Sequence, residues 1–156
     1  MARNTLVEML EAAGVEYVPL RHERTETATG EAAALGVAAV EVAKTVVVDT
    51  PGGHVRVVLP ASERLDLHKL RAVLDVPRKR LHLVNEEELA RDYPEFELGA
   101  VPPFGGARSD PVVLDPRLTA REWVVLEAGS HEDSLRMRAE DLGRLTGARV
   151  ADVCCD

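Results

Sequence analysis

The spacing of apolar residues along the chain predicts helices scattered among short strands. Between residues 6 and 13 the apolar side chains recur at helical intervals, behind the capping-box pattern Thr5-x-x-Glu8, and Gly14 stands where a helix ends. We therefore expect the first helix to begin at Thr5. The same reasoning, with Asp66 and Asn85 as N-caps, predicts further helices at 31–35, 67–74, 86–91 and 140–146.

Runs of β-branched and alternating residues predict the strands between these helices. The most apolar run is 42–48, and a Thr-Pro-Gly-Gly turn at 50–53 leads to a returning strand at 54–59. Because several neighbouring strands form hairpins, we expect a mixed or antiparallel sheet with flanking helices, an α+β fold. The remaining strands are expected at 15–20, 80–84, 111–114, 122–126, 134–138 and 149–153, with a turn at 115–118.

A stretch rich in glycine and proline, LGAVPPFGG at 98–106, interrupts this pattern. Proline fixes φ and lacks an N–H donor, while glycine permits positive φ and close approach to the backbone. The stretch is therefore expected to be a stiff, shaped loop. Two interpretations stay open: a tight turn whose Phe104 caps the core, or a loop that offers backbone N–H groups to a ligand oxygen, as oxyanion holes do.

Lys44 lies inside the most hydrophobic predicted strand, where a lysine is rarely buried without a partner. It could point to a solvated face with Val42 and Val46, or snorkel from an edge strand. Neither alternative fits the apolar surroundings well. We expect Lys44 to face a pocket, where its ammonium meets an anion or a polarised carbonyl, with the backbone N–H of Thr45 beside the same site.

Gly129-Ser130-His131 follows a predicted strand, and its Ser-His pair has two interpretations. The pair could be a nucleophile and its base, although no G-x-S-x-G elbow is present, or the serine could cap a local turn. The other histidines show no metal-ligand spacing, and neither a Walker loop nor G-x-G-x-x-G occurs, so we expect no metal and no cofactor.

The composition narrows the class of protein. The chain of 156 residues is expected to fold as one domain, 1–156, and with only 3% aromatic residues its core must be built from Val, Leu and Ala. The net charge of −8 argues against broad nucleic-acid binding, but not against a pocket that takes one end of a nucleic acid. We expect no signal peptide, no membrane span, reduced thiols at Cys154 and Cys155, and a cytoplasmic location.

An ordered set of motifs resembles a known family. The segments are 43–48 (AKTVVV), 57–61 (VVLPA) with 65–67 (LDL), 99–105 (GAVPPFG), and later Asp115, 128–130 (AGS) and 141–142 (DL). Together they resemble the YbaK/prolyl-tRNA synthetase-associated editing domains, over residues 25–153. The resemblance implies a barrel-like mixed sheet with flanking helices and an enzyme that hydrolyses the ester of mischarged aminoacyl-tRNA.

The resemblance also implies roles at the site. Lys44 would contact the terminal adenosine and orient the ester, and backbone N–H groups near Gly99 would hold the carbonyl oxygen. A water would attack, assisted by the 2′-hydroxyl of the terminal ribose, because the family uses no evident side-chain nucleophile. Further substrate contacts are expected from Thr45, Val101, Pro102, Pro103, Phe104, Gly129, Ser130 and His131.

The substrate and the partners stay open at this stage. Alanyl- and cysteinyl-tRNA for proline are the best-known targets of relatives, but the loop has Val101 before two prolines and His131 is not general in the family. The expected partner is the aminoacylated acceptor end of tRNA, and a synthetase could contribute further contacts with the tRNA. The alternatives are a non-catalytic module that binds an aminoacyl-adenylate or nucleotide, and a small-ester hydrolase that uses Ser130 and His131.

Overall fold

The computed structural model describes residues 2–156, with side chains from Leu6 onward, and has an α+β fold. The helices are α1 (Ala2–Ala12), α2 (Ala28–Leu35), α3 (Leu67–Leu74), α4 (Glu86–Asp92), α5 (Pro116–Thr119) and α6 (Ala139–Thr146), with 3-10 turns η1 (Ala39–Glu41) and η2 (Arg78–Arg80). The strands are β1 (Tyr17–Arg21), β2 (Val42–Thr50), β3 (Gly53–Pro60), β4 (His82–Leu83), β5 (Val112–Leu114), β6 (Trp123–Glu127), β7 (Asp133–Arg138) and β8 (Arg149–Val150).

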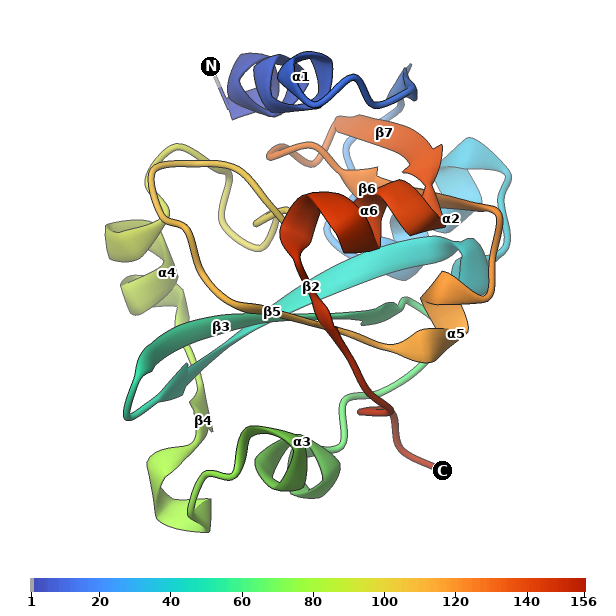
Figure 1. Ribbon diagram of the computed structural model, residues 1–156. Helices are drawn as coiled ribbons and strands as arrows, with labels where there is room; N and C mark the ends of the chain where they lie inside the picture. Colours follow the sequence, from blue (N-terminus) through green and yellow to red (C-terminus); the bar gives the residue numbers. More distant parts are fainter. Residues whose placement is uncertain (1) are drawn as a thin grey trace.

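The strands form one mixed sheet in the order β1-β7-β6-β2-β3-β5-β8, with β4 paired to β2. The hairpins β2–β3 and β6–β7 are antiparallel, whereas β2–β6, β3–β5 and β5–β8 are parallel. Figure 1 shows α1 at one end of the molecule, above β7, and α3 at the opposite end, below the β2–β3 pair. The expected α+β fold with a mixed sheet and flanking helices is confirmed.

The edge of β2 that faces away from β3 is only partly paired. The first two residues of the strand pair with β6, and two residues near its end pair with β4. Between these ladders, no described strand is in register with residues 44–47, although Val84 N–H donates to the Val47 carbonyl. Alternate residues of an antiparallel strand direct their backbone groups to the same side. Thr45 therefore turns its N–H and C=O toward this gap, as Val47 does.

Local capping chemistry explains why α3 and α4 form where the sequence predicts them. The Asp66 side chain accepts hydrogen bonds from the first amides of α3, at His68 and Lys69. Asn85 and Glu88 form a reciprocal capping box at the start of α4. Such caps satisfy the amides that a helix leaves unpaired at its N-terminus. Both predicted helices are confirmed.

Three predicted boundaries are wrong. Helix α1 begins at Ala2, so Thr5 lies within the helix and is not its cap. The expected strand 80–84 is shortened to His82–Leu83, since Arg78–Arg80 forms a 3-10 turn, and the expected last strand is shortened to Arg149–Val150. Strand β8 ends where its partner β5 ends, at Leu114, whereas β4 pairs with only two residues of the longer β2. The apolar pattern indicates neither limit.

The expected turn at 115–118 is also wrong, because it is the helix α5. Asp115 is fully buried and caps this helix by accepting from Arg117 N–H, with Pro116 at the first helical position. The same carboxylate accepts from Val153 N–H and from the Cys154 thiol.

Both cysteines are free, but Cys154 is buried in this contact. Among the described residues, no helix is long and apolar enough to cross a bilayer.

Candidate functional site

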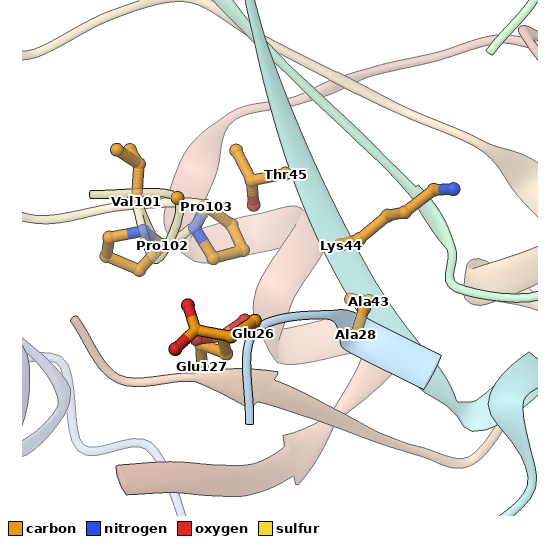
Figure 2. Close-up of a pocket in the computed structure, with 10 residues that line it drawn as sticks. Glu26, Ala28, Ala43, Lys44, Thr45, Val101, Pro102, Pro103 and Glu127 are labelled. Carbon is orange, nitrogen blue, oxygen red and sulfur yellow. The ribbon is translucent and has the colours of Figure 1, made fainter. Parts of the chain in front are cut away.

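A cavity of about 180 Å³ lies where the gap along β2 meets the Gly/Pro loop. Figure 2 shows Glu26 and Glu127 below the two loop prolines, with β2 running down the right side of the view. Its wall comes from the segment before α2, from β2, from the loop and from the end of β6. The lining residues are Glu26, Ala28, Ala43, Lys44, Thr45, Gly99, Val101, Pro102, Pro103 and Glu127.

Lys44 lines the cavity, but its ammonium is directed away from the prolines (Figure 2). The Nζ atom donates to the Glu63 carbonyl, at 2.5 Å, in the turn that follows β3. Burial lowers the pKa of Lys44 below its usual value. A lysine side chain has several rotatable bonds, so the same stem can carry the ammonium from Glu63 to a ligand in the cavity.

The loop presents backbone donors to the cavity. Gly99 has a φ of +84°, a left-handed conformation that glycine adopts without strain. The Ala100 N–H donates to the Glu97 carbonyl, whereas the N–H groups of Gly99 and Val101 donate to no acceptor in the described part of the chain. Both residues line the cavity, and a backbone N–H without an acceptor is the type of group that stabilises a developing oxyanion.

A buried arginine of β3 holds this loop in shape. Arg56 is 1% exposed, and its guanidinium donates to the carbonyls of Pro102 at 3.0 Å and Gly105 at 2.9 Å. It also donates to the Arg108 carbonyl and to the buried Asp110 carboxylate, at 3.3 and 3.1 Å. The planar fork of an arginine suits several acceptors at fixed angles. The loop therefore has a rigid anchor on the side away from the cavity.

The end of the cavity away from the Lys44 ammonium is acidic. Glu127 is largely buried, and burial, followed by the nearby carboxylates Glu31, Glu97 and Glu26, raises its pKa to about 8. Glu31 is fully buried, and burial likewise raises its pKa, although Ser134 donates a hydrogen bond to it. The described residues contain no group of three or more His, Cys, Asp or Glu that could hold a metal ion.

His131 joins the acidic end to the loop. Its Nε2 donates to the Leu98 carbonyl at 2.7 Å, so in the neutral ring Nδ1 carries the lone pair. Nδ1 lies 3.1 Å from Glu127 Oε2, and neither atom has a hydrogen-bond partner elsewhere. A Glu127 carboxyl that keeps its proton at neutral pH can donate it to Nδ1. The ring packs beneath the loop, since a Cβ on Gly99 would lie 3.6 Å from it.

The cavity brings together predicted site residues from two distant segments: Lys44, Thr45, Gly99, Val101, Pro102 and Pro103. Phe104 does not line it, because its side chain packs in the core against Leu6 and its neighbours. That location agrees with the interpretation of Phe104 as a residue that caps the core. The two interpretations of the Gly/Pro loop therefore apply to different residues of the same loop.

Ser130 and His131 do not form a nucleophile–base pair in this arrangement. Ser130 Oγ donates to Asp133 Oδ2 at 2.9 Å and accepts from the N–H groups of Glu132 and Asp133, as in a capped turn. His131 is directed to the loop instead. Gly129, Ser130 and His131 therefore do not line the cavity, although His131 lies against Glu127 of its wall.

Sequence reasoning missed several residues that shape the site. Glu26 lies in a polar stretch that resembled an ordinary loop, and Glu127 ends an apolar strand as a solvent-facing glutamate would. Ala28 and Ala43 carry no chemical signal. Arg56 could have been found, because it is a charged residue inside the apolar strand β3, as Lys44 is inside β2.

Comparisons with known proteins show a family match over most of the chain and solved structures of the same fold. A model of the aminoacyl-tRNA editing domain matches residues 22–145. A solved structure described as a candidate trans-editing enzyme for prolyl-tRNA synthetase is 28% identical, with a TM-score of 0.86, and the match covers 99% of this chain and 98% of that one. A solved protein of unassigned function is also 28% identical, with a TM-score of 0.87 and coverage of 97% and 99%.

A scaffold protein that carries a grafted linear epitope is 25% identical, with a TM-score of 0.84 and coverage of 99% of this chain and 97% of that chain. A search of curated proteins returned no match. The family match spans most of the chain and includes the whole wall of the cavity. The chain therefore belongs to the aminoacyl-tRNA editing domain family and is a deacylase that binds aminoacyl-tRNA.

Proposed function

We propose that the chain is a trans-editing deacylase that cleaves the aminoacyl ester of mischarged proline tRNA, with alanine or cysteine as the amino acid removed. The observation that carries this proposal is the cavity that Lys44 and Thr45 of β2 line together with Gly99 and Val101, whose N–H groups donate to no acceptor among the described residues. An aminoacyl ester is already activated, so orientation and oxyanion stabilisation can supply most of the catalysis.

The proposed chemistry is ester hydrolysis by water. The ester carbonyl oxygen accepts from the loop amides near Gly99, and Lys44 leaves the Glu63 carbonyl to bind the terminal adenosine. Water, oriented by the ribose 2′-hydroxyl, forms a bond to the carbonyl carbon, and the bond to the ribose 3′-oxygen breaks. That oxygen takes a proton as the free amino acid leaves. Neither Ser130 nor His131 has a nucleophilic role in this scheme.

The charges at the two ends of the cavity match such a substrate. Lys44 and Arg64, which lies near it, supply positive charge beside the nucleotide, whereas Glu26 and Glu127 supply carboxyl groups where an α-ammonium would lie. We infer that a cavity of about 180 Å³ suits a small amino acid such as alanine or cysteine. Editing is needed where binding alone discriminates poorly between amino acids of similar size.

Residues 1–156 would act as a single domain. Strands from both ends of the chain, β1 and β8, join the same sheet, and the candidate trans-editing enzyme is matched along nearly all of its length. We infer further that a prolyl-tRNA synthetase could be a partner that delivers the substrate. Co-purification of that synthetase with the chain, in the presence of proline tRNA, tests this association.

The decisive experiment measures deacylation of a panel of mischarged tRNAs, beginning with Ala- and Cys-tRNA for proline. Lys44→Ala should lower the rate at least tenfold, while Arg149→Ala, a change at an exposed arginine on β8, should leave it unchanged. Equal rates in Lys44→Ala and the unchanged protein would show that the proposed mechanism is wrong. No turnover, with retention of an aminoacyl-adenosine analogue, would instead favour a non-catalytic binding module.

A further inference from the structure

One segment of this acidic protein carries a concentrated positive charge. The chain has a net charge of −8, yet the excursion from 64 to 82, which holds α3 and η2 and reaches the first residue of β4, has few acidic residues. Its two aspartates lie at the ends of α3, Asp66 as N-cap and Asp75 as C-cap. The basic residues of this excursion are Arg64, Lys69, Arg71, Arg78, Lys79 and Arg80.

Most of these cations lack an acidic partner. Arg71, Arg78, Lys79 and Arg80 make no ion pair with a carboxylate among the described residues, and the last three are exposed. Some arginines elsewhere are paired, and Arg24 and Arg117, for example, each pair with two carboxylates. Unpaired and exposed cations that gather in one segment create a local positive potential able to attract an anion.

The excursion also contains a shaped hollow. A cavity of about 440 Å³ lies between α3 and η2, lined by Leu67, His68, Arg71, Arg78 and Leu81. Arg71 Nη2 donates to His68 Nδ1 at 2.9 Å, so the neutral ring carries its hydrogen on Nε2 and presents a further donor. Two guanidinium groups and an imidazole N–H around one hollow fit a phosphodiester group.

One end of the excursion follows the residue that holds Lys44, and the other leads to a second cavity beside the first. At one end, Arg64 directly follows Glu63, whose carbonyl holds the Lys44 ammonium. At the other end, Leu83 and Val84 line a second small cavity that shares Thr45, Gly99 and Val101 with the first. Figure 1 shows α3 and β4 together below the β2–β3 pair. A nucleic acid whose 3′ end enters the cavity is therefore within reach of this excursion.

We infer that the excursion 64–82 binds the phosphodiester backbone of the tRNA acceptor stem, with the hollow between Arg71 and Arg78 as a phosphate site. The inference rests on the proposed function and adds the RNA duplex as a second contact. It also explains how an acidic protein binds tRNA, because a few phosphate contacts by arginine supply sequence-independent affinity. Repulsion by the negative charge of the rest of the protein then disfavours RNA binding outside this segment.

The test compares two double variants that remove the same charge. Arg71→Gln with Arg78→Gln changes the hollow, and Arg136→Gln with Arg149→Gln changes two exposed arginines on β7 and β8. Binding of an uncharged acceptor-stem hairpin is measured by fluorescence anisotropy over a range of salt concentrations. Deacylation is measured with full-length aminoacyl-tRNA and with an aminoacyl-adenosine ester that has no stem.

We expect the hollow variant to bind the hairpin at least tenfold more weakly and to lower the slope of log K against log salt by about 2. Its KM for aminoacyl-tRNA should rise with kcat unchanged, and its rate on the stemless ester should match that of the original protein. The control variant should behave as the original protein does in every assay.

Equal hairpin affinity in the hollow and control variants would overturn the inference, even where the original protein deacylates tRNA. An equal loss on the stemless ester would also overturn it, because that loss would reflect damage to the cavity. Hairpin binding that depends on the hollow, in a protein that cleaves no ester, would sustain this surface and refute the proposed function. The two hypotheses can therefore fail separately.

Discussion

Replacing Arg56 with methionine should destabilise the fold and loosen the Gly/Pro loop beside the cavity. The guanidinium makes hydrogen bonds to three loop carbonyls and to Asp110, and the side chain is 1% exposed. Removal of one partner from a buried ion pair costs roughly 3–5 kcal/mol. Asp110 keeps a hydrogen bond from Tyr93 and an ion pair with Arg108, so we expect the lower part of this range, about 3 kcal/mol.

Urea unfolding followed by circular dichroism measures this change. For a chain of this size, about 3 kcal/mol corresponds to a fall in Tm of roughly 6–12 °C. Arg56→Lys should lie between the two proteins, because lysine keeps the charge but lacks the planar fork that reaches several acceptors. Deacylation by Arg56→Met, measured well below its Tm, should also fall, since the loop amides lose their fixed position.

A loss below about 1 kcal/mol in Arg56→Met would refute this reasoning, because it would match an exposed substitution. The matched control is Arg149→Met, whose arginine is exposed on β8. An Arg56→Met protein that is destabilised but fully active would separate the two claims. The guanidinium would then stabilise the fold without shaping the catalytic loop.

Two further predictions concern pH. Glu127 has a folded pKa of about 8, above its usual value of 4.5, so the folded state binds the proton more tightly and stability falls as pH rises from about 5 to 8. The free energy of unfolding changes by at most about 1.4 kcal/mol per pH unit through this group. Glu127→Gln should flatten this pH dependence in urea titrations, and an unchanged slope would contradict the raised pKa of Glu127. Hydrogen bonds from Val153 and Arg117 outweigh burial and lower the pKa of Asp115, so its contribution is lost as pH falls through the folded pKa. Asp115→Asn should cost about 2 kcal/mol at pH 7 and less in acid, and a cost that does not change with pH would argue against a charged cap.

The sequence alone predicts the elements whose causes are local. Asp66 and Asn85 cap α3 and α4 through hydrogen bonds that span a few residues, and the β-branched run of β2 needs no distant partner to favour a strand. The motifs around Lys44 and Gly99 were also sufficient to indicate the family, because they are short and keep their order along the chain. The fold class followed from the hairpins, which are local as well.

Only the tertiary structure decided how these elements meet. The parallel pairing of β2 with β6 joins strands far apart in the sequence, and it stops at Ala43, before the gap beside Thr45. The same holds for the Arg56 contacts with the loop and for the Lys44 ammonium on the Glu63 carbonyl. The physical reason is that a side chain's direction, burial and pKa depend on neighbours brought by long-range packing. The residue pattern along one strand does not specify those neighbours.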